Sequence, residues 1–315
     1  MKKLWALLLC AAFLTGCAAS PAPPASDGAR LRIVTTLFPY YDFARAVAGD
    51  RADVTLLLSP GREAHSFEPT PLDAVAISRA DVFVYNGGES EAWVGQMLDA
   101  AGGRIGTVLR MMDCVDAREE EFVEGMQGAE EEADEDSDEI EYDEHVWTSP
   151  RNAVTLCEAL CGALCGADPA NADAYRANCA AYVGELQELD ARFAALRARA
   201  ARDLLVFADR MPMLYFCEAY SLRYRAAFHG CSADTEPSLA TLKYLIDKVA
   251  EEGIPVVYTV DLDSKKIAEA VAEPTGAGIE TLYSLQTVSR ADFDAGETYL
   301  TLMERNLGAL ERGLG

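Results

Sequence analysis

The chain has 315 residues, half of them hydrophobic, with 52 acidic and 27 basic residues and a formal net charge of -25 at pH 7. Such an acidic protein is not expected to bind nucleic acids or anionic lipid headgroups by charge, whereas cations and basic partners fit it. The length and the apolar fraction predict two lobes, each with its own core.

The chain begins with MKKLWALLLCAAFLTGC, a basic start followed by an apolar run and Leu-Thr-Gly-Cys. This order predicts a lipoprotein signal peptide over residues 1–17, with a lipid on Cys17 that anchors the protein to the outer face of the cytoplasmic membrane. The apolar run is short for a membrane span. Residues 18–30 are rich in Pro, Ala and Ser and predict a flexible tether.

From Leu31 onward, short runs rich in Val, Ile, Leu and Tyr alternate with longer helix-like stretches, which is typical of βα units. Strand candidates begin at Leu31, Asp53, Asp81 and Arg104 in the first half and at Leu204, Tyr224, Pro255 and Ile279 in the second. The pattern predicts an α/β fold of two lobes, each with a mostly parallel sheet flanked by helices. The lobes are expected at residues 31–167 and 203–315, joined by one long connecting helix at 168–202.

An acidic segment, residues 117–144, contains fifteen Asp or Glu residues. Its charges repel one another, so we expect a solvated, mobile loop, although a role in collecting ions stays open. His145 follows directly, in His-Val-Trp-Thr-Ser-Pro. Ser149 is a good N-cap and Pro150 a good first helical residue, so a helix is predicted to start there and to hold His145 in place.

Seven cysteines follow Cys17, an odd number that cannot pair completely within one chain. Cys157, Cys161 and Cys165 recur every four residues and form one helical stripe. The stripe favours core packing, because three ligands along one helix diverge from any single point; a soft-metal site is the alternative.

Candidate metal ligands follow predicted strands. His65, Asp209, His229 and Asp261 each come after one, and His145 follows the acidic segment. Ligands of open α/β sheets bind beyond the carboxyl ends of the strands, and imidazole with carboxylate suits first-row metal ions. A lone loop histidine is commonly only solvated, so these residues suggest a metal site without establishing one. The spacing fits neither a zinc finger nor a metalloprotease helix.

Several motifs, in order, resemble one family: TTLFPYYDFARAVAGD, SPGREAHSFEPTP, DEHVWTSP, CSADTEPSLATLKYLIDKV and DAGETYLTLMERNLGAL. They are similar to the metal-binding solute-binding proteins of zinc and manganese ABC transporters, cluster A-I, over residues 31–310. Glu144 stands where that family usually has Pro. The resemblance implies two α/β lobes with one ion between them, and delivery of that ion by a monomeric carrier to a membrane permease and its ATPase.

The resemblance also implies a ligand set. His65 and His145 match the two ligands of the first lobe, and Asp209 takes the place of the third. Gln286 stands where near relatives have His, and its neutral amide is a poor ligand, so the fourth ligand stays open. His229 is hypothesised to reach the ion instead; the alternative is a histidine at the rim of the cleft.

The expected cargo is Zn²⁺, because imidazole-rich sites select it, with Mn²⁺ as the alternative. A rival interpretation is a lipid-anchored metallohydrolase, but no Ser, Cys or Gly-rich motif suggests covalent or phosphoryl chemistry, so the chain is not expected to be an enzyme. Another is a surface adhesin or scaffold with a vestigial metal site.

Overall fold

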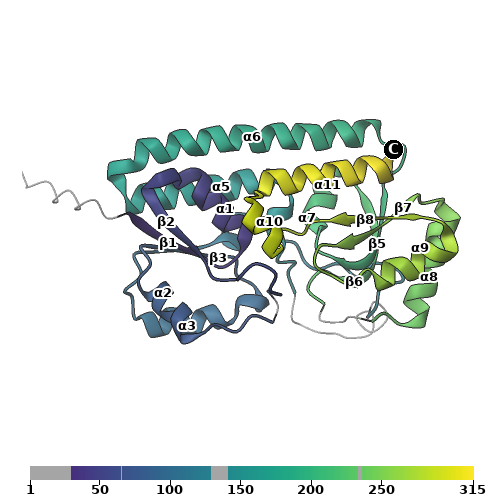
Figure 1. The fold of residues 1–315 in the computed structure, drawn as a ribbon, viewed down its shortest axis with the longest axis horizontal. Coiled ribbons are helices and arrows are strands. Elements are labelled where there is room, and N and C mark those ends of the chain that lie inside the picture. The colour runs from purple at the N-terminus through teal and green to yellow at the C-terminus, as the bar shows by residue number, and fades with distance from the viewer. Residues whose placement is uncertain (1–29, 65, 129–140, 233–235) are drawn as a thin grey trace, which may run out of the picture.

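The computed structural model describes residues 30–64, 66–128, 141–232 and 236–315. It contains two four-stranded sheets, and every strand pairing within them is parallel (Figure 1). The predicted fold class is confirmed. The signal peptide with Cys17 and most of the tether lie outside the described residues.

The first sheet has the order β2-β1-β3-β4 and is flanked by helices on both faces (Figure 1). Its elements are β1 (Leu31–Thr35), α1 (Phe38–Ala48), β2 (Ala52–Leu56), α2 (Pro71–Ser78), β3 (Val82–Tyr85), α3 (Trp93–Ala101), β4 (Thr107–Arg110) and α5 (Pro150–Ala167). Local signals set several of the helix ends. In α2, for example, Thr70 and Asp73 form a capping box, with Pro71 as the first helical residue.

The second sheet has the order β6-β5-β7-β8. Its elements are β5 (Leu204–Met211), α7 (Leu214–Tyr220), β6 (Arg223–His229), α8 (Leu239–Glu252), β7 (Val256–Val260), α9 (Lys266–Thr275), β8 (Gly278–Leu282), α10 (Arg290–Ala295) and α11 (Tyr299–Leu314). All eight strand candidates are confirmed. However, β5 continues to Met211 and β6 to His229, so Asp209 and His229 lie within strands rather than after them.

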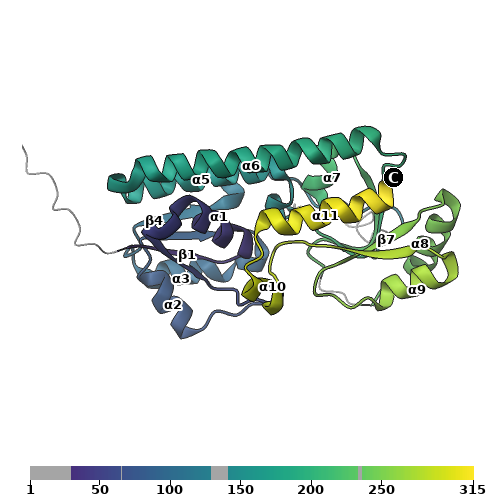
Figure 2. The same ribbon diagram turned by 45° about the horizontal axis from the view of Figure 1, so that its top comes forward.

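A long helix, α6 (Ala172–Arg199), runs along both lobes, and α11 lies beside it (Figures 1 and 2). It begins four residues later and ends three residues earlier than the expected connecting helix, because a short turn at Pro169–Asn171 precedes it. In the described part of the chain, no single helix could cross a membrane on length and apolarity; α5 and α6 pass only as a pair, bent by 118°.

The cysteine stripe packs where α5 meets α6. Cys157 and Cys161 are buried, and the Sγ of Cys157 lies 4.0 Å from the Sγ of Cys179 on α6. These cysteines are free thiols, and burial raises the pKa of Cys157 and Cys161. The core-packing interpretation of the stripe is confirmed.

The acidic segment differs from the expectation in its described residues. Glu120 is nearly inaccessible, with 4% of its side chain exposed, and Met126 is buried. The Gln127 amide donates a hydrogen bond to the Ala227 carbonyl on β6, and Tyr224 donates one to Glu121. Residues 117–128 therefore contact the second lobe through Glu120, Glu121 and Glu124, although the side chains of Glu119, Glu121 and Glu124 are exposed to solvent as expected. Residues 129–140 lie outside the described part.

Candidate metal centre

His145 is held between a carboxylate and an aromatic ring. Its imidazole is buried, and both its backbone N and its ring Nδ1 face Asp143 Oδ1, at 2.7 and 3.2 Å. The Trp147 ring packs edge-on against it, with the ring centroids 5.5 Å apart. Because Nδ1 faces Asp143, Nε2 is the ring nitrogen that points away from this carboxylate.

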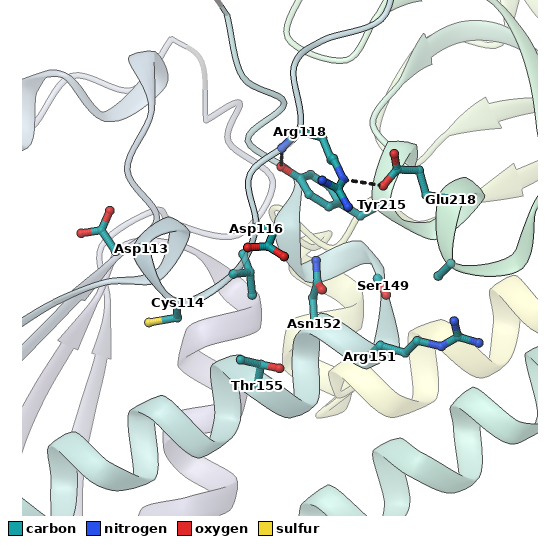
Figure 3. A pocket seen from close by; sticks show the side chains of 12 residues that line it. Asp113, Cys114, Asp116, Arg118, Ser149, Arg151, Asn152, Thr155, Tyr215 and Glu218 are labelled. Carbon is teal, nitrogen blue, oxygen red and sulfur yellow. Dashed lines mark hydrogen bonds and ion pairs between the residues drawn. The ribbon is translucent and has the colours of Figure 1, made fainter.

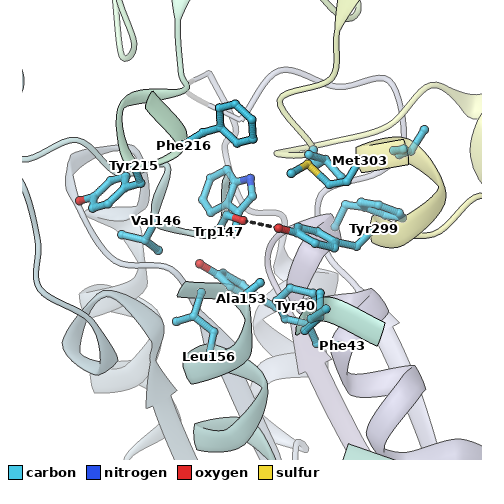
Figure 4. Close-up of a cluster of buried hydrophobic side chains, with 14 of the residues drawn as sticks. Tyr40, Phe43, Val146, Trp147, Ala153, Leu156, Tyr215, Phe216, Tyr299 and Met303 are labelled. Carbon is cyan, nitrogen blue, oxygen red and sulfur yellow. Dashed lines mark hydrogen bonds between the residues drawn. The ribbon is translucent and has the colours of Figure 1, made fainter. Parts of the chain in front are cut away.

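The segment after His145 is fixed by contacts with the rest of the core (Figure 4). Trp147 Nε1 donates a hydrogen bond to the Ser284 carbonyl of the second lobe, at 2.8 Å. Tyr299 donates to the Trp147 carbonyl, also at 2.8 Å. The α5 helix starts at Pro150 as predicted, although the Ser149 side chain makes no capping hydrogen bond. His145 thus projects from a rigid support that joins both lobes.

A cavity of about 160 Å³, the interlobe cavity, opens beside His145. The first lobe contributes residues 61–63 and His145; the second contributes residues near the carboxyl ends of its strands, namely Arg210, Pro212, Gly230, Val260, Asp261, Leu262, Asp263, Ser284, Gln286 and Thr287. This is the edge at which α/β sheets bind ligands. The structure therefore brings two of the predicted residues, His145 and Gln286, to one cavity.

Gln286 is buried, and its backbone also joins the lobes. Its carbonyl accepts a hydrogen bond from the Phe38 amide at the start of α1, at 3.3 Å. Its side chain lines the interlobe cavity and can offer an amide oxygen, which is a weaker ligand for transition metals than imidazole or carboxylate.

Asp209 does not line this cavity. It lies within β5, where the pairing with β6 shifts register between Phe207 and Arg210. Its Oδ2 accepts hydrogen bonds from Thr259 Oγ1 at 2.7 Å and Val260 N at 2.9 Å, on the neighbouring strand β7. Its carboxylate lines a different hollow, next to Phe228 and Leu242. Although these hydrogen bonds favour the charged form, burial raises the pKa of Asp209.

His229 also lies outside the lining of the interlobe cavity. Its Nδ1 is 2.6 Å from Glu120 Oε2, and Phe122 packs against its ring. Burial of Glu120 opposes its charge, but the hydrogen bond and the charge of His229 lower the pKa of this carboxyl. The described acidic segment is thus pinned to β6 by the histidine that was hypothesised to reach the ion.

His65 lies outside the described residues, although its neighbour Ala64 is described and buried. Within residues 30–64, 66–128, 141–232 and 236–315, no three His, Cys, Asp or Glu side chains are arranged to hold a metal ion. A complete ligand set at the interlobe cavity would therefore need His65 or a movement of side chains.

The charged residues of the cavity that were not in the predicted ligand set are three acidic and two basic ones, namely Glu63, Asp261, Asp263, Arg62 and Arg210. Asp261 follows β7 directly, Asp263 comes two residues later, and Arg210 is the neighbour of Asp209. The sequence signal for Asp261 is its position directly after a predicted strand, at the edge where α/β sheets bind ligands. The inward direction of Arg210 depends on the register shift in β5, which has no signature in the sequence.

Burial and nearby charges shift the pKa values of His145 and Asp261, two titratable groups that line the cavity. Burial opposes protonation of His145, but the negative charges of Asp143, Glu144 and Glu120 outweigh it and raise its pKa. Burial raises the pKa of Asp261 to about 7, even though the Ser284 amide donates to its Oδ1 at 2.6 Å. Protons therefore compete with a metal ion for both groups, and for Asp261 they do so near pH 7.

A larger groove of about 790 Å³ lies elsewhere between the lobes and is lined in part by Cys114, Asp116, Arg118, Asn152 and Tyr215 (Figure 3). Arg118 borders it beside α7, donating from its backbone to Tyr215 and from its side chain to Glu218. None of the predicted ligands lines this groove, so its size does not make it the metal site.

A family model described as "Zinc-uptake complex component A periplasmic" matches residues 33–313. The chain belongs to this family. The resemblance found in the sequence motifs is confirmed, and so is the prediction that the chain is not an enzyme, because the family is a component of metal uptake. Its description as periplasmic agrees with the extracytoplasmic location that the signal peptide predicts.

The chain is similar to two curated members along nearly its whole length. It is 34% identical over 319 residues to the zinc-binding lipoprotein AdcA of Streptococcus pneumoniae strain R6, covering 99% of this chain and 61% of that protein. It is 31% identical over 318 residues to the high-affinity zinc uptake system protein ZnuA of Bacillus subtilis strain 168, covering 99% of this chain and 97% of that protein. The chain thus spans about three-fifths of the length of AdcA.

A solved structure with the same fold is the Zn(II)-bound ZnuA-like domain of Streptococcus pneumoniae AdcA. It aligns with a TM-score of 0.74 and 31% sequence identity, covering 91% of this chain and 99% of that chain. This chain therefore shares its two-lobe fold with that domain.

Proposed function

We propose that the protein is the extracytoplasmic solute-binding component of an ABC importer that captures Zn²⁺ between its lobes and delivers it to a membrane permease and its ATPase. The observation that carries this proposal is His145, a buried imidazole oriented by Asp143 and facing a cavity between the lobes. Family membership and the zinc-binding relatives support it. A lipid on Cys17 would hold the carrier at the membrane.

His65 and His145 are the proposed imidazole ligands from the first lobe. From the second lobe, we infer that Asp261 and Gln286, which line the cavity, complete the shell, with Asp209, outside this lining, as a further candidate. Zn²⁺ is favoured because imidazole selects it and because its tetrahedral shell accepts a water or a weak ligand. Mn²⁺ is the second candidate, since the nearby carboxylates of Asp261 and Asp263 are the oxygen ligands it prefers.

Capture is expected to change loops more than the angle between the lobes. The lobes share α6, and Trp147, Tyr299 and Gln286 make hydrogen bonds across them. Metal binding requires the neutral imidazole of His145, whose pKa is raised, so acidification should release the metal at a higher pH than it would from an unperturbed histidine.

The test is metal content and affinity of the purified protein, with Zn²⁺ and Mn²⁺ in competition. We expect one Zn²⁺ per chain at neutral pH and a loss of more than about tenfold in affinity for His145→Ala and for His65→Ala. His229→Ala is the matched variant, because its ring is engaged with Glu120 outside the interlobe cavity. A wild-type protein that retains neither metal would refute the carrier function and favour a scaffold with a vestigial site.

A further inference from the structure

Arg210 places a positive charge in the cavity proposed to receive a cation. Its Nη2 lies 2.9 Å from both carboxylate oxygens of Asp263 and 3.5 Å from Glu63 Oε2. The Arg210 side chain is mostly buried, with 19% exposed, whereas Arg62, the other cation of the lining, is exposed. The guanidinium is thus fixed by two carboxylates rather than free in solvent.

These two carboxylates come from different lobes. Glu63 belongs to the loop between β2 and α2 of the first lobe, and Asp263 follows β7 of the second. Arg210 therefore joins the lobes across the interlobe cavity that His145 and Gln286 also line. Arg210 and Asp263 also line the hollow that Asp209 lines, so this ion pair borders both hollows.

A guanidinium and a divalent metal ion compete for the same carboxylates. Both are stabilised by carboxylates, and at the short range of a partly buried site they repel each other strongly. A metal ion at His145 would meet the charge of Arg210 across a cavity of about 160 Å³. Either the metal binds more weakly than it would without Arg210, or Arg210 moves away from one of its carboxylates.

We propose that Arg210 is an affinity-determining residue that acts as an internal competitor of the metal: it holds Glu63 and Asp263 before the metal enters and must release at least one of them when the metal binds. The inference rests on the proposed function of the same cavity. Release of Glu63 by Arg210 would break this ion pair between the two lobes. Return of Arg210 would favour unloading.

The test is the Zn²⁺ affinity of the purified protein, measured by competition with a chromogenic chelator. Arg210→Met removes the charge and keeps the apolar part of the side chain, and we expect binding at least about tenfold tighter than in the wild type. Arg210→Lys keeps the charge and should stay near the wild type. Arg305→Met is the control, since Arg305 pairs with Asp292 and Glu297 away from the cavity. Binding by Arg210→Met that is unchanged or weaker overturns the proposal.

A second measurement does not depend on the stability of Arg210→Met. In the NMR spectrum of the wild type, the Nε–Hε signal of Arg210, assigned by its absence in Arg210→Lys, should shift when Zn²⁺ is added. An unshifted signal at saturating Zn²⁺ contradicts release of the guanidinium. The two proposals can fail separately: if neither the wild type nor Arg210→Met binds Zn²⁺, the carrier function is wrong, whereas tight wild-type binding that Arg210→Met does not improve refutes only the role of Arg210.

Discussion

Glu144 shows how one unusual residue is accommodated beside the candidate ligand. Its carboxylate accepts hydrogen bonds from the backbone N and the hydroxyl of Ser90, and its carbonyl accepts one from Asn86 Nδ2. The carboxylate packs over Gly88, which has a positive φ of 86° and where a Cβ would overlap it. The carboxylate of Glu144 is therefore satisfied, and it adds negative charge near His145.

Glu91 is the residue for which the structure predicts a measurable pH effect. Burial raises its pKa to about 7, and its Oε1 has no hydrogen-bond partner among the described residues. The pKa of Glu91 in the folded protein lies above the ordinary value of 4.5. Its contribution to the free energy of unfolding is therefore fully present below pH 4.5 and is lost as the pH rises through 7. The loss is up to about 3 kcal/mol in the free energy of unfolding.

Glu91→Gln should remove this part of the pH dependence, because the amide stays neutral. Urea unfolding at pH 5 and pH 8.5 measures it: the wild type should lose more stability between these pH values than Glu91→Gln does. Glu89→Gln, at an exposed position two residues earlier, should behave like the wild type. Equal losses for the wild type and Glu91→Gln would mean that Glu91 is ionised in the fold at both pH values.

At the scale of elements, the loops after β7 and β8 each contain a residue in the left-handed region, Leu262 with φ 68° and Leu285 with φ 63°. Both loops border the interlobe cavity. A left-handed conformation costs a residue with a Cβ about 1–2 kcal/mol. The elements that form the cavity thus contain local strain, which the surrounding contacts of the fold must offset.

Leu262→Gly is expected to stabilise the protein by up to about 1 kcal/mol, because Gly removes the strain at the cost of greater freedom in the unfolded chain. Leu262 is half exposed, so little burial is lost. The urea midpoint without added metal measures the change. The same substitution at exposed Leu72, in the first turn of α2, should instead destabilise the protein, since Gly is a poor helix former. A destabilising Leu262→Gly would show that the Leu262 side chain is needed.

The elements were largely predictable, because their signals are local. Runs of β-branched residues mark the strands, and Ser149 with Pro150 marks the start of α5. The end of β5 was not predictable: Asp209 stays in the strand because it accepts hydrogen bonds from Thr259 and Val260, and these belong to a strand about 50 residues away. A contact of that kind leaves no local pattern in the sequence.

At the scale of the whole molecule, some residues of the candidate site could likewise be predicted from the sequence and others could not. His145 and Gln286 were found because they lie in or near recognisable motifs, and both line the interlobe cavity. Arg210 reaches the cavity only through the register of β5, and Glu120 engages His229 only because residues 117–128 pack on the second lobe. Motifs therefore predicted which residues could bind a metal, while the folded chain determines which charges surround them.

The lobes and the long helix meet at Asp42, a buried residue of α1. Its Oδ2 accepts hydrogen bonds from the Tyr182 hydroxyl on α6, at 3.0 Å, and from the Tyr299 amide on α11, at 2.9 Å. Asp42→Ala leaves both buried donors without a partner and should lower the free energy of unfolding by about 3 kcal/mol in urea titrations. Asp42→Asn keeps an acceptor oxygen and should lose much less, because burial already raises the pKa of Asp42 and disfavours its charge. Asp173→Ala, on the exposed face of α6, should leave stability unchanged. Equal losses for Asp42→Ala and Asp42→Asn would show that the charge of Asp42, rather than its hydrogen bonds, holds the three helices together.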